Sequence, residues 1–146
     1  MEQADDRSTW VGAEGERDGK PFIVRARRFE PGAEPMAPLP VLLVIDVTYE
    51  CFDETRLPFR EQYEQADIFE HTIFDALEQR GQLKFVFAET GDGKIRYFTY
   101  VRDAEGVVAF LKQKVSQALP VEIFSGSDPQ WDEYKRRMAA LLPPES

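Results

Sequence analysis

Cysteine and histidine are almost absent from this chain: Cys51 and His71 are the only residues of their kinds among 146. A single cysteine excludes a disulfide within the chain, and nothing in the sequence indicates an oxidising compartment. One cysteine and one histidine also cannot supply the usual ligand set of a zinc site. The acidic residues show no calcium-loop spacing. We therefore expect no metal and no other cofactor.

Long hydrophobic runs are missing as well. No apolar stretch approaches the roughly 20 residues that a helix needs to cross a bilayer. The first residues, MEQADDRSTW, are acidic and lack the apolar centre of a signal peptide. We expect a cytoplasmic protein without membrane association.

Positive charge is in deficit, with 18 Lys and Arg against 27 Asp and Glu and a net charge of −9. Nucleic-acid binding depends mainly on neutralising phosphates, so an acidic chain is a poor candidate for it. A basic protein surface is the more natural charged partner. The charge is equally consistent with a role in solubility alone.

The length of 146 residues and the 42% hydrophobic content indicate one globular domain over residues 1–146. Residues 1–7 are polar, and we expect them to be disordered. Residues 30–40, EPGAEPMAPLP, contain four prolines and form an extended connector within the domain.

A hairpin from Leu83 to Arg102 is the best-defined local structure. Two apolar runs flank Asp92-Gly93, a dipeptide that favours the two positive-φ positions of a type I′ turn. If this turn sets the register, the facing pairs are Glu89 and Arg96, Phe87 and Phe98, and Phe85 and Tyr100.

The remaining elements are predicted from the hydrophobic periodicity and from the residues that typically begin or end helices and strands. We predict a first hairpin from Thr9–Glu14 and Pro21–Phe29 through Asp18-Gly19, a central strand Val41–Thr48, a helix Pro58–Arg80 closed by Gly81, a helix from Ala104 to about Leu119, a strand Val121–Phe124, and a last helix with Asp128 as N-cap and Pro129 in its first position. From Val41 onward this order is strand, helix, strand, strand, helix, strand. It predicts an α+β fold, a ferredoxin-like βαββαβ sandwich with an added N-terminal β-hairpin and a C-terminal helix.

Several short motifs carry a resemblance. They are Trp10, the segment Asp18-Gly19-Lys20-Pro21, the strand RYFTYV, and the late D-P-x-W-x-x-Y from Asp128 to Tyr134. Together they resemble an uncharacterised, mainly bacterial family catalogued as domain of unknown function 695. The resemblance implies a small α+β domain with no known catalytic residues. It also implies a possible distant relation to the regulator of ribonuclease E activity B, an inhibitor of an RNA-degrading enzyme.

Asp46 is the first candidate for a functional residue, because it interrupts an otherwise apolar strand. A buried carboxylate costs several kcal/mol unless it is paired. It is either a polar anchor or acid/base in a cleft, or a structural residue bonded to a backbone amide or to an arginine such as Arg96 or Arg102. His71 and Cys51 are expected to be a helix-surface residue and a packing cysteine, and a Cys–His pair would require the fold to join them.

Trp131 and Tyr134 lie close together on the last predicted helix and face the same way. They either line a groove or dock the helix on the sheet. The central hairpin is apolar on both faces, with Tyr97 on the second, so that face needs a cover from the first hairpin, the last helix or a partner.

These observations favour a non-enzymatic protein-binding or regulatory module that contacts another protein or its own copy, although the sequence does not exclude an enzyme. The alternative is a small-molecule-binding protein or small enzyme with a site near Asp46 and Trp131/Tyr134. The candidate binding residues are Asp46, Arg96, Tyr97, Trp131 and Tyr134.

Overall fold

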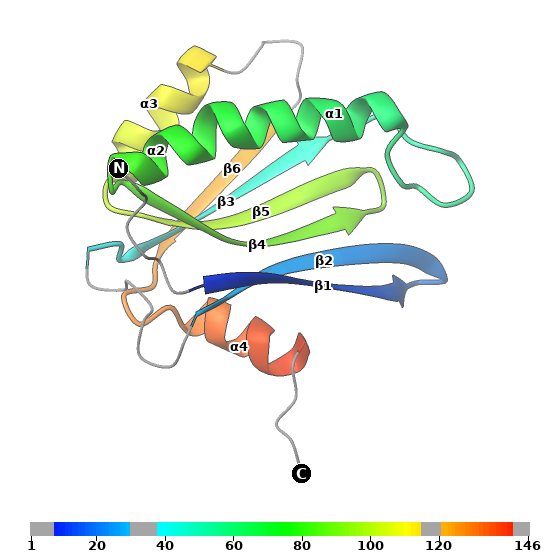
Figure 1. Ribbon diagram of the computed structural model, residues 1–146, viewed down its shortest axis with the longest axis horizontal. Helices are drawn as coiled ribbons and strands as arrows, with labels where there is room; N and C mark the ends of the chain where they lie inside the picture. The colour runs from blue at the N-terminus through cyan, green and yellow to red at the C-terminus, as the bar shows by residue number, and fades with distance from the viewer. Residues whose placement is uncertain (1–7, 30–37, 115–120, 142–146) are drawn as a thin grey trace.

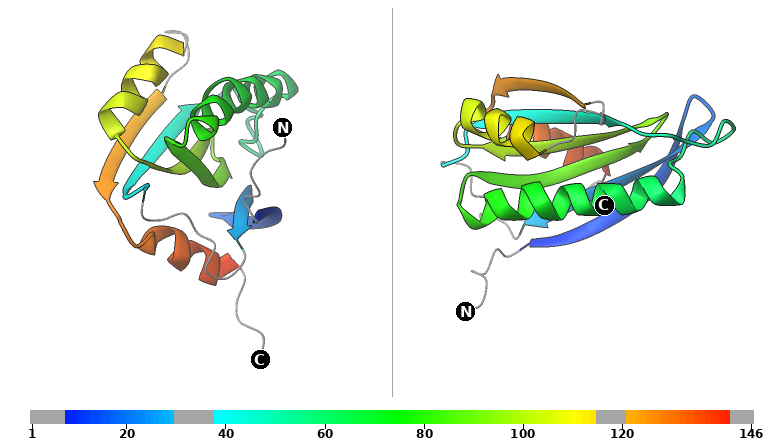
Figure 2. Two further views of the ribbon diagram at one scale, coloured as in Figure 1. Left: turned by 60° about the vertical axis from the view of Figure 1, so that its left-hand side comes forward. Right: turned by 90° about the horizontal axis from the view of Figure 1, so that it is seen from above.

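A computed structural model describes residues 8–29, 38–114 and 121–141. Within these ranges six antiparallel strands form one sheet in the order β1-β2-β4-β5-β3-β6, with helices on both faces (Figures 1 and 2). The strands are β1 (Ser8–Arg17), β2 (Lys20–Phe29), β3 (Val41–Thr48), β4 (Leu83–Gly91), β5 (Lys94–Val101) and β6 (Val121–Ser127). The helical segments are α1 (Arg60–Phe69), η1 (Glu70–Asp75), α2 (Ala76–Gln79), α3 (Ala104–Lys114) and α4 (Asp132–Leu141). The mixed α+β class predicted from the sequence is confirmed.

Both predicted tight turns form, and their backbone explains why. Asp18 and Gly19 have φ values of 55° and 77°, and Asp92 and Gly93 have values of 51° and 83°. Two successive positive φ angles are the requirement of a type I′ turn, which Asp-Gly meets at low cost. The first hairpin extends the sheet, because β2 pairs with β4.

The register of the central hairpin is confirmed near its turn and wrong farther away. Glu89 faces Arg96 and Phe87 faces Phe98, as predicted. Phe85, however, faces Thr99 rather than Tyr100, because the register shifts between Phe85 and Phe87. Such a bulge places one extra residue on one strand. Here it lets the consecutive residues Val86 and Phe87 join the same hydrophobic cluster.

One face of the sheet is covered by α3 and by the continuous helix α1-η1-α2 (Figure 2, left). This helix ends before Gly81, whose φ of 69° is the left-handed conformation expected at its C-terminal end. Between its α-helical parts, η1 is a six-residue π-helix. Ile73 and Phe74 of η1 and Leu77 of α2 pack into the core on this face with Leu43 and Ile45 of β3.

The opposite face, which carries Phe87 and Phe98, is covered in part by α4. The prediction that the Tyr97 face of the central hairpin needs a cover other than the two helices was wrong, because Tyr97 packs against the long helix. The start of the last helix was also predicted wrongly, since α4 begins at Asp132 and Pro129 precedes it in a turn. The turn arises because Trp131 has a φ of 58° and donates its backbone N–H to the Asp128 carbonyl. The Asp128 carboxylate nevertheless accepts the backbone N–H groups of Asp132 and Glu133, so it caps the helix as expected.

The other elements agree with the predictions, with small differences at their ends. β6 continues three residues beyond the predicted Phe124. α3 is described as far as Lys114, and the rest of that predicted helix, to Leu119, lies outside the described residues. The predicted disordered segment 1–7 and positions 30–37 of the connector also lie outside them. No helix in the described ranges is long and apolar enough to cross a membrane.

Candidate functional site

Two rows of side chains run across four neighbouring strands on the face that α4 partly covers. Residues directly opposite each other on paired strands project to the same face, so the strand register defines the rows. The charged row consists of Glu89, Arg96, Asp46 and Glu122 on β4, β5, β3 and β6. The neighbouring apolar row consists of Phe87, Phe98, Val44 and Phe124 on the same strands.

The Asp46–Arg96 pair is the centre of the charged row. Arg96 donates from Nε to Oδ1 of Asp46 at 2.7 Å and from Nη2 to Oδ2 at 2.8 Å. The Asp46 side chain is 2% exposed and that of Arg96 is 42% exposed. The hydrogen bonds to Asp46 raise the pKa of Arg96 despite its partial burial. The pairing of Asp46 with an arginine is the structural alternative recognised in the sequence, with Arg96 as the partner.

Glu89 connects this row to α4. Its Oε2 accepts a hydrogen bond from Nη1 of Arg137 at 2.6 Å, and its Oε1 lies 3.7 Å from Nη1 of Arg17. The Arg137 guanidinium also lies 4.2 Å from the centre of the Phe98 ring. Arg137 therefore attaches α4 to the sheet and covers the buried part of the apolar row. Neither Arg17 nor Arg137 was singled out from the sequence, because each meets Glu89 only after distant segments pack together.

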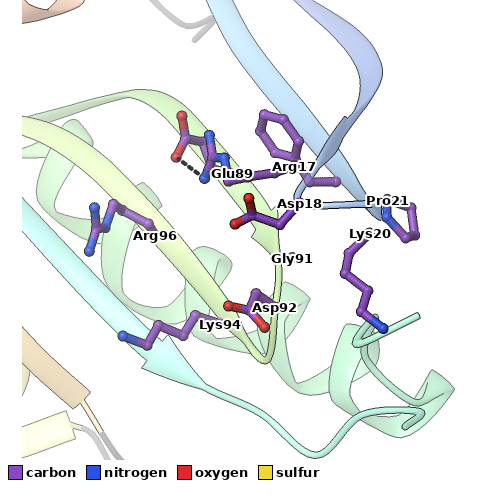
Figure 3. Close-up of a pocket in the computed structure, with 10 residues that line it drawn as sticks. Arg17, Asp18, Lys20, Pro21, Glu89, Gly91, Asp92, Lys94 and Arg96 are labelled. Atoms are coloured by element: carbon purple, nitrogen blue, oxygen red, sulfur yellow. Dashed lines mark ion pairs between the residues drawn. The ribbon is translucent and has the colours of Figure 1, made fainter. Parts of the chain in front are cut away.

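A pocket of about 360 Å³ adjoins Arg96 at the end of the sheet where the two tight turns lie (Figure 3). Its charged lining residues are Arg17, Lys20, Lys94, Arg96, Asp18, Glu89 and Asp92. Most of these groups are already satisfied within the protein: Lys20, for example, donates to the Glu54 carbonyl, and Asp92 lies 3.4 Å from Arg56. Four cations and three anions leave little net charge, so this pocket does not select strongly for a charged ligand.

The residues of the apolar row become more exposed toward the sheet edge, where α4 no longer covers them. Phe87 and Phe98 are buried, Val44 is half-buried, and Phe124 is 52% exposed. Phe124 lies on β6, which is paired only with β3 among the described strands. An exposed aromatic side chain therefore stands beside a row of backbone groups that have no sheet partner in the described part of the chain.

Tyr97 does not belong to this site, because it faces the helices on the other side of the sheet. Its hydroxyl donates to Oε2 of Glu70 at 2.9 Å, and Arg25 binds both Glu70 oxygens at 3.1 and 2.7 Å. Burial, followed by the charge of Glu70 and the hydrogen bond to it, raises the pKa of Tyr97. Arg25 and Glu70 were missed as a pair, because they lie 45 positions apart in the chain.

Trp131 and Tyr134 act in docking. Trp131 is fully buried, stacks on Tyr100 with ring centroids 4.3 Å apart, and donates its indole N–H to the Leu39 carbonyl at 2.9 Å. Tyr134 is 5% exposed and donates its hydroxyl to the Arg27 carbonyl. Both side chains are thus buried where α4 docks on the sheet, on the face opposite Tyr97. Neither lines the pocket of Figure 3.

Asp128 links the D-P-x-W-x-x-Y motif to the sheet. The Tyr100 hydroxyl donates to Oδ2 of Asp128 at 2.7 Å and accepts the backbone N–H of Tyr134 at 3.2 Å. Burial and the hydrogen bond to Asp128 raise the pKa of Tyr100. The motif therefore explains how α4 is held in place.

His71 is a helix-surface residue and Cys51 is a packing cysteine, as expected from the sequence. The His71 side chain is 77% exposed on the helix, with Nδ1 3.2 Å from Oδ2 of Asp75. Cys51 is a half-buried free thiol that packs against the helix-side core. Among the described residues, no group of three or more histidine, cysteine or acidic residues is arranged to hold a metal ion.

The sequence model of a family of unknown function, domain of unknown function 695 (DUF695), matches residues 8–137. No curated protein and no solved structure matches the chain.

Proposed function

Because this chain belongs to DUF695, a family of unknown function, we propose its role from the geometry of its own surface. We propose a non-enzymatic protein-binding module that accepts an extended, basic segment of another protein along β6. The single observation that carries this proposal is the exposed Phe124 on an edge strand, where the apolar row emerges from under α4.

Two features of β6 suit it to receive a peptide strand. Its outer backbone groups have no sheet partner among the described strands, and main-chain hydrogen bonding to such an edge supplies affinity in strand addition. Phe124 and the half-buried Val44 supply an apolar contact beside that edge. A large aromatic side chain at the centre of a small patch is a typical anchor of protein interfaces.

Charge favours a basic partner over a second copy. Exposed Glu122 is the only charged residue of β6, and the chain as a whole carries a net charge of −9. Two such copies repel each other over long distances, whereas a basic segment is attracted. Self-association, which the sequence left open, is therefore less favourable at β6 than binding of a basic segment.

The finer fold assignment is part of the same proposal. The neighbour order β6-β3-β5-β4, with β3 connected to β4 by α1-η1-α2 and β5 connected to β6 through α3, supports a ferredoxin-like core. The hairpin β1-β2 and α4 would be additions to it. The relation to the ribonuclease regulator stays a prediction from the sequence. The alternative small-molecule site near Asp46 gains no support, because Trp131 and Tyr134 are buried where α4 docks on the sheet and line no pocket with Asp46 among the described residues.

The proposal is tested by capturing proteins from a lysate of the source organism with three immobilised baits. These are the wild-type chain, Phe124→Ser, and the matched control Phe52→Ser. Phe52 is 53% exposed, similar to Phe124, but lies outside the sheet. Each variant removes one exposed phenylalanine, although the Phe52 ring also contacts the Phe59 ring, with centroids 4.8 Å apart.

We expect a protein that the wild-type chain and Phe52→Ser retain, that Phe124→Ser loses, and that elutes as salt is raised. Recovery of the same proteins by all three baits would overturn the β6 proposal. Recovery of additional bait molecules alone would identify the partner as a second copy and contradict the basic-partner assignment.

A further inference from the structure

We propose that the segment bound along β6 runs antiparallel to it and carries an aromatic, an apolar and a basic residue at alternate positions, in that order from its N-terminal end. This inference rests on the proposed function, because it specifies the partner segment of the same edge. Glu122, Phe124 and Gly126 of β6 lie on the α4 face of the sheet, since residues two positions apart in a strand share a face. Each of the three has a different environment, and together they define the pattern.

Glu122 has no ion pair with a cation within the described part of the chain. It lies directly opposite Asp46 on β3, and like charges in that arrangement are unfavourable. Arg96, the one cation of the charged row, donates to both Asp46 oxygens and makes no ion pair with Glu122. A lysine or arginine on an added strand would extend the row with the missing positive charge. The residue that faces Glu122 is therefore basic.

Phe124 continues the apolar row to the edge of the sheet. The row covers this side chain from β3 alone, through Val44, and leaves it 52% exposed. An apolar residue on an added strand would face Phe124 and remove its ring from water. Pairs of an aromatic and a β-branched residue are favoured cross-strand neighbours. The residue that faces Phe124 is therefore apolar, and valine or isoleucine suits it best.

Gly126 leaves an open place on the same face. A Cβ atom at Gly126 would meet no atom of the described residues within 4 Å. The opposite residue on β3 is Leu42, whose side chain is only half-buried. A strand glycine offers no side chain for packing, and an aromatic residue across from an edge glycine compensates for this. The residue that faces Gly126 is therefore aromatic.

The antiparallel direction follows the rest of the sheet. Every strand pair among the described residues is antiparallel. Antiparallel pairing is also slightly more stable per residue than parallel pairing. In this direction the N-terminal end of the bound segment lies beside Gly126 and its C-terminal end lies beside Glu122. The order of the three residues in the partner is thereby fixed.

The test titrates peptides with blocked ends into the isotope-labelled full chain and follows its backbone amide signals by NMR at low salt. The direct peptide, Thr-Phe-Thr-Val-Thr-Lys-Thr, matches the seven residues of β6. The reversed peptide, Thr-Lys-Thr-Val-Thr-Phe-Thr, has the same composition and charge. Two further peptides carry glutamate in place of lysine and alanine in place of phenylalanine.

The protein variant is Glu122→Gln, with Glu14→Gln as its matched control. Glu14 is an exposed residue of β1, the strand at the opposite edge of the sheet. Both variants remove one exposed negative charge from an edge strand. A difference between them therefore reports the position of the charge and not its total.

We expect the direct peptide to shift the amide signals of β6 and to bind more tightly than the other three peptides. Glu122→Gln should weaken the direct peptide about threefold, the usual size of a cross-strand charge pair. Glu14→Gln should leave its affinity unchanged. The glutamate peptide should not distinguish Glu122→Gln from Glu14→Gln by a loss of affinity, because it has no cation to lose.

Equal binding of the direct and reversed peptides would overturn the proposal, because composition and charge alone would then account for binding. Equal weakening by the two glutamine variants, or no binding of any peptide at millimolar concentration, would overturn it as well. The proposed function is judged separately. A lysate protein that Phe124→Ser loses supports it whatever the peptides do, and recovery of the same proteins by all three baits removes it.

Discussion

The two partners of the Asp46–Arg96 pair differ strongly in their access to water. The Asp46 carboxylate is almost completely buried, whereas nearly half of the Arg96 side chain reaches solvent. Removing the arginine leaves a buried charge without compensation, but removing the aspartate leaves an arginine that water can still solvate. Removing Arg96 should therefore destabilise the protein more than removing Asp46.

We predict that Arg96→Met lowers the free energy of unfolding by about 3 kcal/mol, more than Asp46→Val does. The double variant Asp46→Val/Arg96→Met should recover much of that loss, because no buried charge remains. Urea unfolding of the three variants measures the differences. Equal losses in both single variants, with no recovery in the double variant, would show that Asp46 has access to other compensation.

Asp128 gives the stability of the protein a dependence on pH. Burial alone would raise its pKa, but hydrogen bonds from the Tyr100 hydroxyl and from the backbone of Glu133 and Asp132 outweigh burial, and the pKa falls below the usual 3.8. A carboxylate with a lowered pKa stabilises the folded state above its unfolded pKa. That stabilisation is lost as pH falls through the folded pKa.

We predict that Asp128→Asn destabilises the protein by about 1 kcal/mol at neutral pH, because an amide has one oxygen and cannot accept the hydrogen bonds that Oδ1 and Oδ2 both receive. The difference from the wild type should narrow as pH falls below the unfolded-state pKa of about 3.9 and through the lower pKa of the folded state. Urea unfolding across this pH range checks both statements. A difference that stays constant down to the lowest pH would mean that the charge of Asp128 contributes nothing.

The end of β4 approaches β2 closely, and Gly91 is the residue that permits this. A Cβ atom at Gly91 would lie 2.8 Å from Cβ of Phe22 and 3.3 Å from the Pro21 carbonyl oxygen. On the edge strand β6, a Cβ atom at Gly126 would meet no atom within 4 Å. The two strand glycines therefore differ in the space around them.

We expect Gly91→Ala to destabilise the fold by about 1–3 kcal/mol, the usual cost of forcing atoms into a packed site. Gly126→Ala should be neutral or slightly stabilising, because alanine restricts the unfolded chain without meeting a neighbour. Thermal unfolding of the two variants measures both effects. Equal stability of Gly91→Ala and Gly126→Ala would contradict this prediction. It would mean that β2 can move away from β4 without a cost in free energy.

Elements governed by local chemistry could be predicted from the sequence. The Asp-Gly turns and the apolar run of β3 depend on residues adjacent in the chain, and both were located correctly. The bulge at Val86 could not be predicted, because it depends on packing against both faces of the sheet. The start of α4 was missed for a similar reason, since Trp131 leaves helical geometry in order to stack on Tyr100.

The candidate site shows the same division. The Asp46–Arg96 pair was among the predicted possibilities because a carboxylate in an apolar strand requires a partner. The exposure of Phe124 could not be predicted, because it depends on where α4 stops covering the sheet. The Glu70–Arg25 contact joins residues that are 45 positions apart, and no local pattern indicates it.

The molecule presents two different faces on one sheet. The long helix and α3 cover one face, where a pocket lies beside Glu70 of η1, while α4 covers only part of the other. The net charge of −9 favours positively charged binding partners at both faces. The uncovered edge at β6 and the acidic charge together suit the molecule to a basic partner rather than to its own copy.

We predict that the purified chain is a monomer at micromolar concentration and low salt, because charge repulsion opposes pairing of two β6 edges. Sedimentation measured at low and moderate salt checks this. Dimerisation that strengthens as salt is raised, and that Phe124→Ser abolishes, would instead assign β6 to self-association.

The most direct test of the central claim is amide hydrogen exchange of the chain, free and bound to its captured partner. Strand addition predicts new protection of the outward-facing amides of β6, Val121–Ser127, on binding, with no comparable change in β1 at the opposite edge. Unchanged exchange throughout β6 in a saturated complex would contradict the proposal and place the protein-binding surface elsewhere.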